Sequence, residues 1–181
     1  YATTPSNLIA RMPENLSFTD AAACVLAGVS ALQVIDEVIK LKPGHKILIH
    51  GGSGGIGSFA IQLARYRGAY VATTATGTGI DFVKNLGAHE VIDYKKQKFD
   101  DMLSGYDAVF DNVGGDTYKR SFKILKKGGV IASMREQPDV ELMKKSGVTA
   151  QYEFTNTNTA SLDILAKLIE KGAITVCIDK T

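Results

Sequence analysis

The glycines at positions 52–57 are the residues whose type and spacing point most directly to chemistry. In a G-x-G-x-x-G loop, Gly52 would permit a tight turn, Gly54 would let the backbone approach a pyrophosphate, and Gly57 would let a helix pack closely on a strand. The N-terminus of that helix adds free N–H groups and a positive dipole end. We therefore expect a dinucleotide here, the alternative being a glycine-rich turn without a ligand. The glycine loop comprises Gly52, Ser53, Gly54, Gly55, Ile56 and Gly57.

The preference between NAD and NADP depends on the turn after the next predicted strand, residues 73–78. A carboxylate at the end of that strand would accept a hydrogen bond from the ribose 2′-hydroxyl of NAD. The chain has Thr74 and Thr76 there and no acidic residue before Asp81. The missing carboxylate removes repulsion against a 2′-phosphate, and threonine hydroxyls can donate to it. We therefore expect NADP rather than NAD, although the turn contains no arginine or lysine.

The elements that must position these residues alternate between strand and helix along the chain. Short apolar runs predict strands, and apolar residues at helical spacing predict helices between them. This alternation indicates an α/β fold, a doubly wound parallel sheet (Rossmann fold) of six strands with helices on both faces. The predicted strands are 46–50, 70–75, 90–94, 106–111, 130–134 and 148–154. One predicted helix follows the glycine loop and ends at Gly68, and three further helices are predicted at 81–86, 117–126 and 161–171.

Two segments fit this alternation less well. Near the N-terminus, a small-residue helix at 21–26 is expected to be interrupted by Gly28 and to continue over 31–39. Near the C-terminus, residues 174–178 form a short apolar run that predicts a last strand, for which the pattern offers no partner. The sequence leaves the position of that strand open.

Composition excludes several classes of protein. With 45% hydrophobic residues among 181 and a net charge of +2, the chain is neither disordered nor a basic nucleic-acid binder. No apolar stretch is expected to span a membrane, so a membrane is not an expected partner. The low net charge means that a nucleic acid is not an expected partner either. Cys24 and Cys177 lie in apolar runs and are expected to be buried free thiols, which favours a cytoplasmic location.

Several ordered stretches together resemble the medium-chain dehydrogenase/reductase superfamily, and within it the zinc-independent, zeta-crystallin-like quinone oxidoreductases. The resemblance runs along nearly the whole chain and is far more specific than the glycine loop alone. The stretches that carry it are 13–17 (PENLS), 21–23 (AAA), 27–31 (AGVSA), 50–57 (HGGSGGIG), 86–88 (LGA), 91–94 (VIDY) and 110–115 (FDNVGG).

The resemblance implies further cofactor-binding positions. Ser30, in place of the usual threonine, would lie beside the nicotinamide, and Tyr94 would contact the 2′-phosphate with help from Lys95. The stretch after the fourth strand and the end of the fifth strand would approach the cofactor, which implicates Asn112, Val113, Gly114 and Ser133. The alternatives are structural: Tyr94 as a strand cap, Ser30 bonded to its own helix backbone, and Ser133 in the core.

The resemblance also bears on metal binding and on domain organisation. Zinc alcohol dehydrogenases of this superfamily have a metal-binding cysteine where this chain has Leu26, so no zinc is expected. Enzymes of the family pair the cofactor domain with a GroES-like catalytic domain, most of which is expected to be missing. We expect residues 1–15 to be the tail of that domain, 16–173 the NAD(P)-binding domain, and 174–181 a return toward the absent domain.

The function implied by the resemblance is hydride transfer from NADPH to a small molecule, a quinone or an α,β-unsaturated carbonyl. The histidines are isolated in sequence and no general acid is assigned, so the catalytic residues are unknown and this chain alone is expected to be inactive. A zinc-type alcohol dehydrogenase relative, an enoyl-reductase module and a non-catalytic nucleotide-binding domain are the alternatives. Relatives dimerise through the sixth strand, so a homodimer through the edge strand 148–154 is expected.

Overall fold

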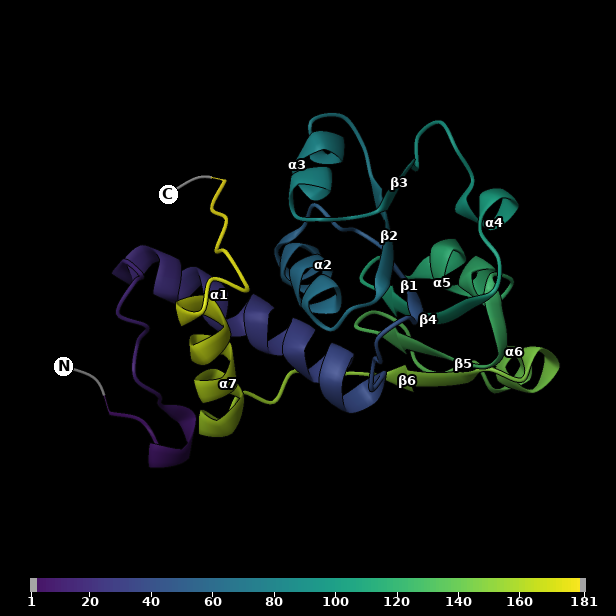
Figure 1. Cartoon of the computed structure of the whole chain (residues 1–181). Helices are drawn as coiled ribbons and strands as arrows, with labels where there is room; N and C mark the ends of the chain where they lie inside the picture. Colours follow the sequence, from purple (N-terminus) through teal and green to yellow (C-terminus); the bar gives the residue numbers. More distant parts are fainter. Residues whose placement is uncertain (1–2, 180–181) are drawn as a thin grey trace.

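A six-stranded parallel sheet forms the centre of the computed structural model, which describes residues 3–179 (Figure 1). The strand order is β3-β2-β1-β4-β5-β6, so the chain reverses direction across the sheet between β1 and β4. This order confirms the predicted doubly wound fold. The strands are β1 (Lys46–Ile49), β2 (Tyr70–Ala75), β3 (Glu90–Asp93), β4 (Tyr106–Asp111), β5 (Leu125–Ser133) and β6 (Thr149–Tyr152).

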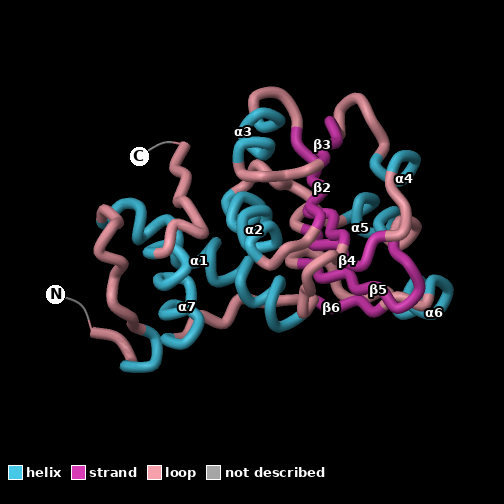
Figure 2. The backbone as a smooth tube through the Cα atoms, viewed as in Figure 1, coloured by secondary structure: helices cyan, strands magenta, loops and turns pink. Residues whose placement is uncertain are grey.

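Helices cover both faces of this sheet (Figure 2). One face packs against α1 (Phe18–Leu32), α2 (Gly55–Tyr66), α3 (Gly79–Asn85) and α7 (Thr159–Glu170). The other face packs against α4 (Phe99–Met102), α5 (Gly115–Ser121) and α6 (Val140–Ser146). A single turn of 3₁₀-helix, η1 (Ser6–Leu8), precedes α1 and lies against α7.

Alternation along β1 explains how one strand serves both layers. Ile47 and Ile49 are fully buried in the layer of α1 and α2, whereas Leu48 is fully buried in the opposite layer. Successive side chains of a strand point to opposite faces, so a run of apolar residues is the pattern of a strand covered on both sides. Because β1 is third in the order of six strands, its carboxyl end lies near the middle of the sheet edge, directly before the glycine loop.

The N-terminal helix differs from its prediction. α1 continues through Gly28 and runs into a π-helical segment, η2 (Gln33–Val38), so glycine does not interrupt it. Gly28 instead lies directly against α7, because a Cβ there would lie 2.6 Å from Leu165 Cδ2. This contact between helices, which the sequence does not reveal, leaves no room for a side chain at position 28.

The combined helix Phe18–Val38 also bears on the expectation about membranes. It has 21 residues and a mean hydropathy of 1.7, so its length and composition would allow it to cross a membrane, contrary to the expectation that no stretch would. Half of its apolar window is buried inside the protein, and the core helix of a soluble protein passes the same test. The absence of a membrane partner stays a prediction.

Other differences concern the second half of the chain. The predicted helix 117–126 ends at Ser121, and β5 begins at Leu125, so Gly128 and Gly129 lie inside the strand. Residues 174–178 form no strand; Ile174 is buried, and the Gln62 side chain hydrogen-bonds both the N–H and the carbonyl of Thr175. The short helices α4 and α6 were not predicted. Cys24 is buried as expected, but Cys177 is exposed.

The predicted boundaries at residues 15 and 173 remain expectations about a longer protein. Their outermost residues, 1–2 and 180–181, lie outside the described part of the chain. Within it, residues 3–17 and 171–179 lie beside α1 and α7, at one end of the molecule (Figure 1).

Candidate nucleotide-binding site

Glycine is required in the glycine loop mainly by close packing. The turn out of β1 is made by Gly51, whose φ is +69°, rather than by Gly52 as predicted. A Cβ on Gly52 would collide with the Thr73 hydroxyl, and one on Gly57 would collide with the Gly51 carbonyl oxygen and lie 2.7 Å from Gly52 Cα. The predicted reason for Gly57, close packing of helix on strand, agrees with these contacts.

The N-terminus of α2 offers free donors at this loop. Its N-cap is Gly54, no side chain within residues 3–179 caps it, and its first turn contains no acidic residue. The first N–H groups of a helix have no partner within the helix, and the dipole makes this end positive. The exposed face is formed by Ser53, Gly54 and Gly55. This arrangement suits a phosphate group.

Two cavities flank the glycine loop and share Ser53. The first, of about 700 Å³, extends toward Thr76, Thr78 and the C-terminal segment, including Cys177. The second, of about 400 Å³, extends to Tyr94, Val113 and Arg120, and also contacts His50, Gly51, Thr74, Gln97, Phe99 and Thr117. Both lie at the carboxyl ends of strands, and the smaller one is lined from both sides of the β1–β4 reversal, where doubly wound folds bind ligands.

The threonines of the β2 turn have different surroundings. Thr74 is buried, and its Oγ1 accepts a hydrogen bond from the Gly51 N–H at 3.1 Å. Thr76 lines the larger cavity and donates to Asp93 Oδ1 at 2.8 Å. That hydrogen bond is the main reason why the pKa of Asp93 lies below its usual range. This carboxylate beside the β2 turn could not be predicted from the sequence, because it comes from β3.

Tyr94 directly follows β3 and is 56% exposed at the mouth of the smaller cavity. Its phenol is accessible to a ligand, as the expected contact with a 2′-phosphate requires. Lys95, the expected helper, is also exposed, and its N–H donates to Asp93 Oδ1 at 3.1 Å.

Residues after β4 and β5 are joined by a buried hydrogen-bond cluster around Asp111. Its carboxylate accepts from the N–H groups of Val113 and Gly114 and from the Ser133 hydroxyl at 2.7 Å. The Ser133 hydroxyl also accepts from the N–H groups of Arg135 and Glu136. Ser133 therefore shapes two loops, with its hydroxyl fully used within the protein. Sequence reasoning missed Asp111, whose role appears only when the two strands lie side by side.

Asn112 presents a free acceptor at the same strand ends. Its Nδ2 donates to the His50 carbonyl at 3.1 Å, whereas its Oδ1 is buried and has no partner among the described residues. A buried polar atom without a partner is costly and is typical of a place where a ligand supplies the missing hydrogen bond. Val113 beside it is 49% exposed in the smaller cavity, and Gly114 adopts a φ of +80° that favours glycine.

Ser30 is hydrogen-bonded to the backbone of its own helix, which is the alternative to a position beside the nicotinamide. Its hydroxyl donates to the Leu26 carbonyl one turn earlier at 2.7 Å and lies 2.5 Å from the Thr155 hydroxyl. It is 1% exposed and lines neither cavity beside the glycine loop. The neighbouring Gln33 side chain pairs with the backbone of Asn156, so these contacts attach α1 and η2 to the segment after β6.

Metal ligands are not grouped in the described part of the chain, where no three His, Cys, Asp or Glu side chains are placed to hold an ion. Leu26 is 65% exposed on α1, and the thiol of Cys24 is buried and donates to the Ala21 carbonyl. The expectation of a zinc-independent protein rests on Leu26 and stays a prediction.

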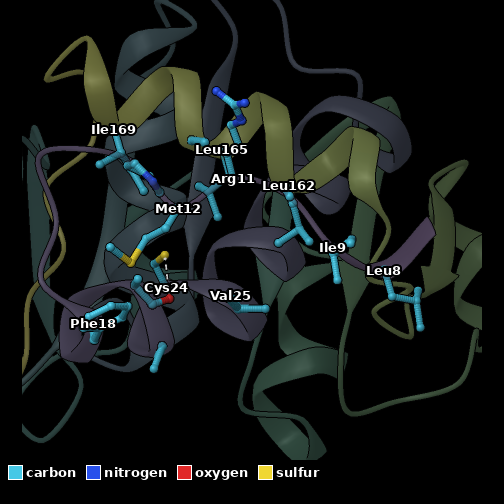
Figure 3. Close-up of a pocket in the computed structure, with 15 residues that line it drawn as sticks. Leu8, Ile9, Arg11, Met12, Phe18, Cys24, Val25, Leu162, Leu165 and Ile169 are labelled. Carbon is cyan, nitrogen blue, oxygen red and sulfur yellow. Dashed lines mark hydrogen bonds between the residues drawn. The ribbon is translucent and has the colours of Figure 1, made fainter. Parts of the chain in front are cut away.

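A separate apolar groove lies between residues 8–13, α1 and α7 (Figure 3). Its lining includes Leu8, Ile9, Met12 and Phe18, the last of which is 85% exposed. It contains few polar groups and is formed by none of the glycine-loop residues. The groove therefore offers apolar contact area rather than a site for phosphate chemistry.

Comparison with known proteins relates the chain to oxidoreductases. The family model for zinc-binding dehydrogenases matches residues 55–135, which include α2 and strands β2 to β5. A chloroplastic NADPH-dependent alkenal/one oxidoreductase from Arabidopsis thaliana is 32% identical over 99% of this chain, and the match covers 44% of that protein. The chain thus spans less than half the length of this relative.

Solved structures show the same fold. A quinone oxidoreductase from Coxiella burnetii superposes with a TM-score of 0.83 and 36% identity, over 92% of this chain and 53% of that one. The Escherichia coli quinone oxidoreductase complexed with NADPH gives a TM-score of 0.84 at 26% identity, over 93% and 58%. These findings confirm the resemblance: the chain has the quinone oxidoreductase-like fold of the medium-chain dehydrogenase/reductase superfamily.

Proposed function

We propose that the chain binds NADPH and is the cofactor-binding part of a zinc-independent oxidoreductase that reduces quinones or α,β-unsaturated carbonyls. The observation that carries this proposal is the glycine loop, which leads into the N-terminus of α2, where no side chain of the described residues forms a cap. A cavity lies on each side of this loop, at the carboxyl ends of the strands. The similarity to the Arabidopsis and E. coli proteins, both described with NADPH, supports the choice of cofactor.

The chain's own residues divide the binding tasks. The free N–H groups at the start of α2 would hold the pyrophosphate, and the exposed Tyr94 phenol would contact a 2′-phosphate. The Thr76 hydroxyl, expected from the sequence to donate to that phosphate, donates to Asp93 instead. The Asn112 Oδ1 would accept a hydrogen bond from a ribose hydroxyl, which satisfies its orphaned atom. A bound nicotinamide supplies a hydride, and the protein orients the ring and excludes side reactions.

Titration of the chain with NADPH and with NADH tests the proposal. We expect NADPH to bind at least about tenfold more tightly, and Tyr94→Phe to weaken NADPH by about tenfold while leaving NADH almost unchanged, because only NADPH carries the 2′-phosphate. Tyr66→Phe, at an exposed tyrosine at the end of α2, is the matched control. Equal affinities would remove NADP as the preferred cofactor, and no binding of either would refute the nucleotide site.

Turnover is tested with a protein that includes this chain and the additional length of its relatives. We expect loss of NADPH absorbance with a quinone or an enone. Reaction with acyl thioesters alone would favour an enoyl-reductase module. Binding without turnover on any of these substrates would favour a non-catalytic nucleotide-binding domain.

We also propose a homodimer formed along β6 and a cytoplasmic location. β6 is the last strand of the sheet, and Tyr152 and Phe154 are 38% and 79% exposed beside its open edge. Both cysteines are free, which is compatible with a reducing compartment. Cell fractionation would test the location, and recovery with an organelle would refute it.

A further inference from the structure

His50 is a buried histidine that the proposed nucleotide contacts leave without a role. It follows β1 directly, is 1% exposed, and packs edge-on against the Phe99 ring with a centroid distance of 4.6 Å. Its backbone carbonyl accepts from Asn112 and its backbone N–H donates to the Phe110 carbonyl, so the residue is held between β1 and β4.

Hydrogen bonds define which nitrogen of the His50 ring carries the proton. The Ser121 hydroxyl donates its only proton to the Thr117 carbonyl at 2.7 Å, so it must accept from His50 Nε2–H at 2.9 Å. In a neutral imidazole the other nitrogen is then an acceptor. This Nδ1 faces the Thr74 hydroxyl at 3.4 Å, so Thr74 donates to it.

The Thr74 hydroxyl connects His50 to Gly51, the residue directly before the glycine loop. With its proton directed at His50, the Thr74 Oγ1 presents lone pairs to the Gly51 N–H at 3.1 Å. Gly51 makes the positive-φ turn out of β1, and its carbonyl accepts from the Gly54 N–H at 3.0 Å. The chain of contacts thus runs from α5 through His50 and Thr74 to the N-cap of α2.

The charges around His50 favour its neutral form. Burial first, and then the positive charge of Arg120 on α5, lower the pKa of His50 to about 3. Arg120 is paired with Asp100 of α4. Besides His50 and Arg120, Tyr94 is the titratable residue that lines the smaller cavity. A neutral ring is the only form that leaves Nδ1 free to accept from Thr74.

We propose that His50 is a positioning residue for nucleotide binding, whose Nδ1 orients the Thr74 hydroxyl and thereby holds Gly51 and the glycine loop in the shape that receives the phosphates. This inference rests on the proposed nucleotide site and assigns His50 a role that acts through Thr74 and Gly51.

Variants at Thr74 test the transfer to the loop with almost no change in volume. Thr74→Ser keeps the hydroxyl, and Thr74→Val replaces it with a methyl group of similar size. We expect Thr74→Ser to bind NADPH within about threefold of the unmodified chain and Thr74→Val to bind about tenfold more weakly, the equivalent of one hydrogen bond. Equal affinities of the two variants would overturn the proposal.

Variants at His50 test whether its Nδ1 orients the Thr74 hydroxyl. They also test the proposal if Thr74→Val does not fold. Asparagine can place an amide oxygen near the Nδ1 position, whereas glutamine can place an amide N–H near the Nε2 position. Both lose the ring, so both lose the contact with Phe99. We expect His50→Asn to bind NADPH about tenfold more tightly than His50→Gln.

The remaining outcomes separate this inference from the proposed function. His50→Asn and His50→Gln with equal NADPH affinity, while the unmodified chain binds, would refute the role of Nδ1 alone. No binding by the unmodified chain would refute the nucleotide site itself. His45→Gln, at a histidine in the turn before β1, controls for loss of an imidazole elsewhere and should leave the affinity unchanged.

Discussion

At the scale of single residues, buried polar side chains hold the loops that line the site. The Asp111 carboxylate and the Ser133 hydroxyl bind backbone N–H groups of the loops after β4 and β5, and the Thr74 hydroxyl binds the turn after β1. Each such bond contributes about 1 kcal/mol when made, and a partner left unpaired costs about 1–3 kcal/mol. The neutral ring of His50 is buried among them and hydrogen-bonds the Thr74 and Ser121 hydroxyls.

The low pKa of His50 predicts a specific pH dependence of stability. Its pKa is about 3 in the folded chain and 6.5 when unperturbed, so between these values the unfolded state binds the extra proton. The stabilisation is complete above pH 6.5 and is lost as the pH falls toward 3. We expect the free energy of unfolding to fall by about 1 kcal/mol more in the unmodified chain than in His50→Gln between pH 6.5 and 5.5.

Urea unfolding at pH 7.5, 6.5 and 5.5 measures this difference. The window lies above the titration of Asp100, whose pKa is lowered to about 2 by its hydrogen bond with Arg120. His89 has a lowered pKa as well, but it is present in both proteins and its contribution cancels. Parallel stability curves for the two proteins would show that His50 is not held neutral.

Part of the site could be predicted because its requirement is local. The glycine loop is recognisable since its glycines, strand and helix are adjacent in sequence. The roles of Thr74 and Ser133 could not be predicted, because the partner of a hydroxyl is set by strands that meet only in the fold. Ser30 was expected near the cofactor, but its hydroxyl is bonded within α1 and to Thr155.

At the scale of elements, the contact of α1 with α7 depends on one missing side chain. Gly28 lies beneath Leu165, which is 2% exposed, and a Cβ would lie 2.6 Å and 3.0 Å from its two methyl carbons. Alanine is about 1 kcal/mol better than glycine inside a helix, whereas overpacking a core costs about 1–3 kcal/mol. Because Leu165 is enclosed, the overpacking cost is the larger of the two.

A double-mutant cycle tests this contact. We expect Gly28→Ala to lower the free energy of unfolding by about 1 kcal/mol and Leu165→Ala to lower it by about 2–4 kcal/mol. The double variant should lose at least about 1 kcal/mol less than the sum, because the new methyl group enters the space left by leucine. Gly28→Ala combined with Leu168→Ala, also on α7, should be additive. Additivity in both pairs would refute the contact.

Elements could be predicted where an apolar run is bounded by turn residues. β2 and β4 match their predictions residue for residue. The start of β5 could not be predicted, because its first residues pair with Tyr106 across a register shift that only the neighbouring strand reveals. Residues 174–178 resemble a strand in composition, yet they pack beside α2 and hydrogen-bond the Gln62 side chain.

At the scale of the whole molecule, the sheet has two unlike edges. β3 ends one side, and β6 ends the other with the short run Thr149–Tyr152. An open edge strand with aromatic neighbours is prone to pair with another chain. A second copy related by a two-fold axis would satisfy this edge in both chains at once.

The oligomeric state is a direct test of that arrangement. We expect sedimentation equilibrium to give twice the mass of the chain, and a Tyr152→Lys and Phe154→Lys double variant to give the mass of one chain, because charge opposes edge pairing. Val140→Lys, on an exposed position of α6, is the control and should stay dimeric. A monomeric unmodified chain would refute the dimer.

The unequal exposure of the two cysteines provides a natural labelling position. Cys24 is buried, whereas Cys177 is exposed and lines the same cavity as Ser53 and Gly54. Partial burial raises the pKa of the Cys177 thiol, so labelling with a maleimide dye is best done at mildly alkaline pH. The native chain would then carry a single fluorophore beside the glycine loop, and its emission would report on the occupancy of the cavity without any engineered residue.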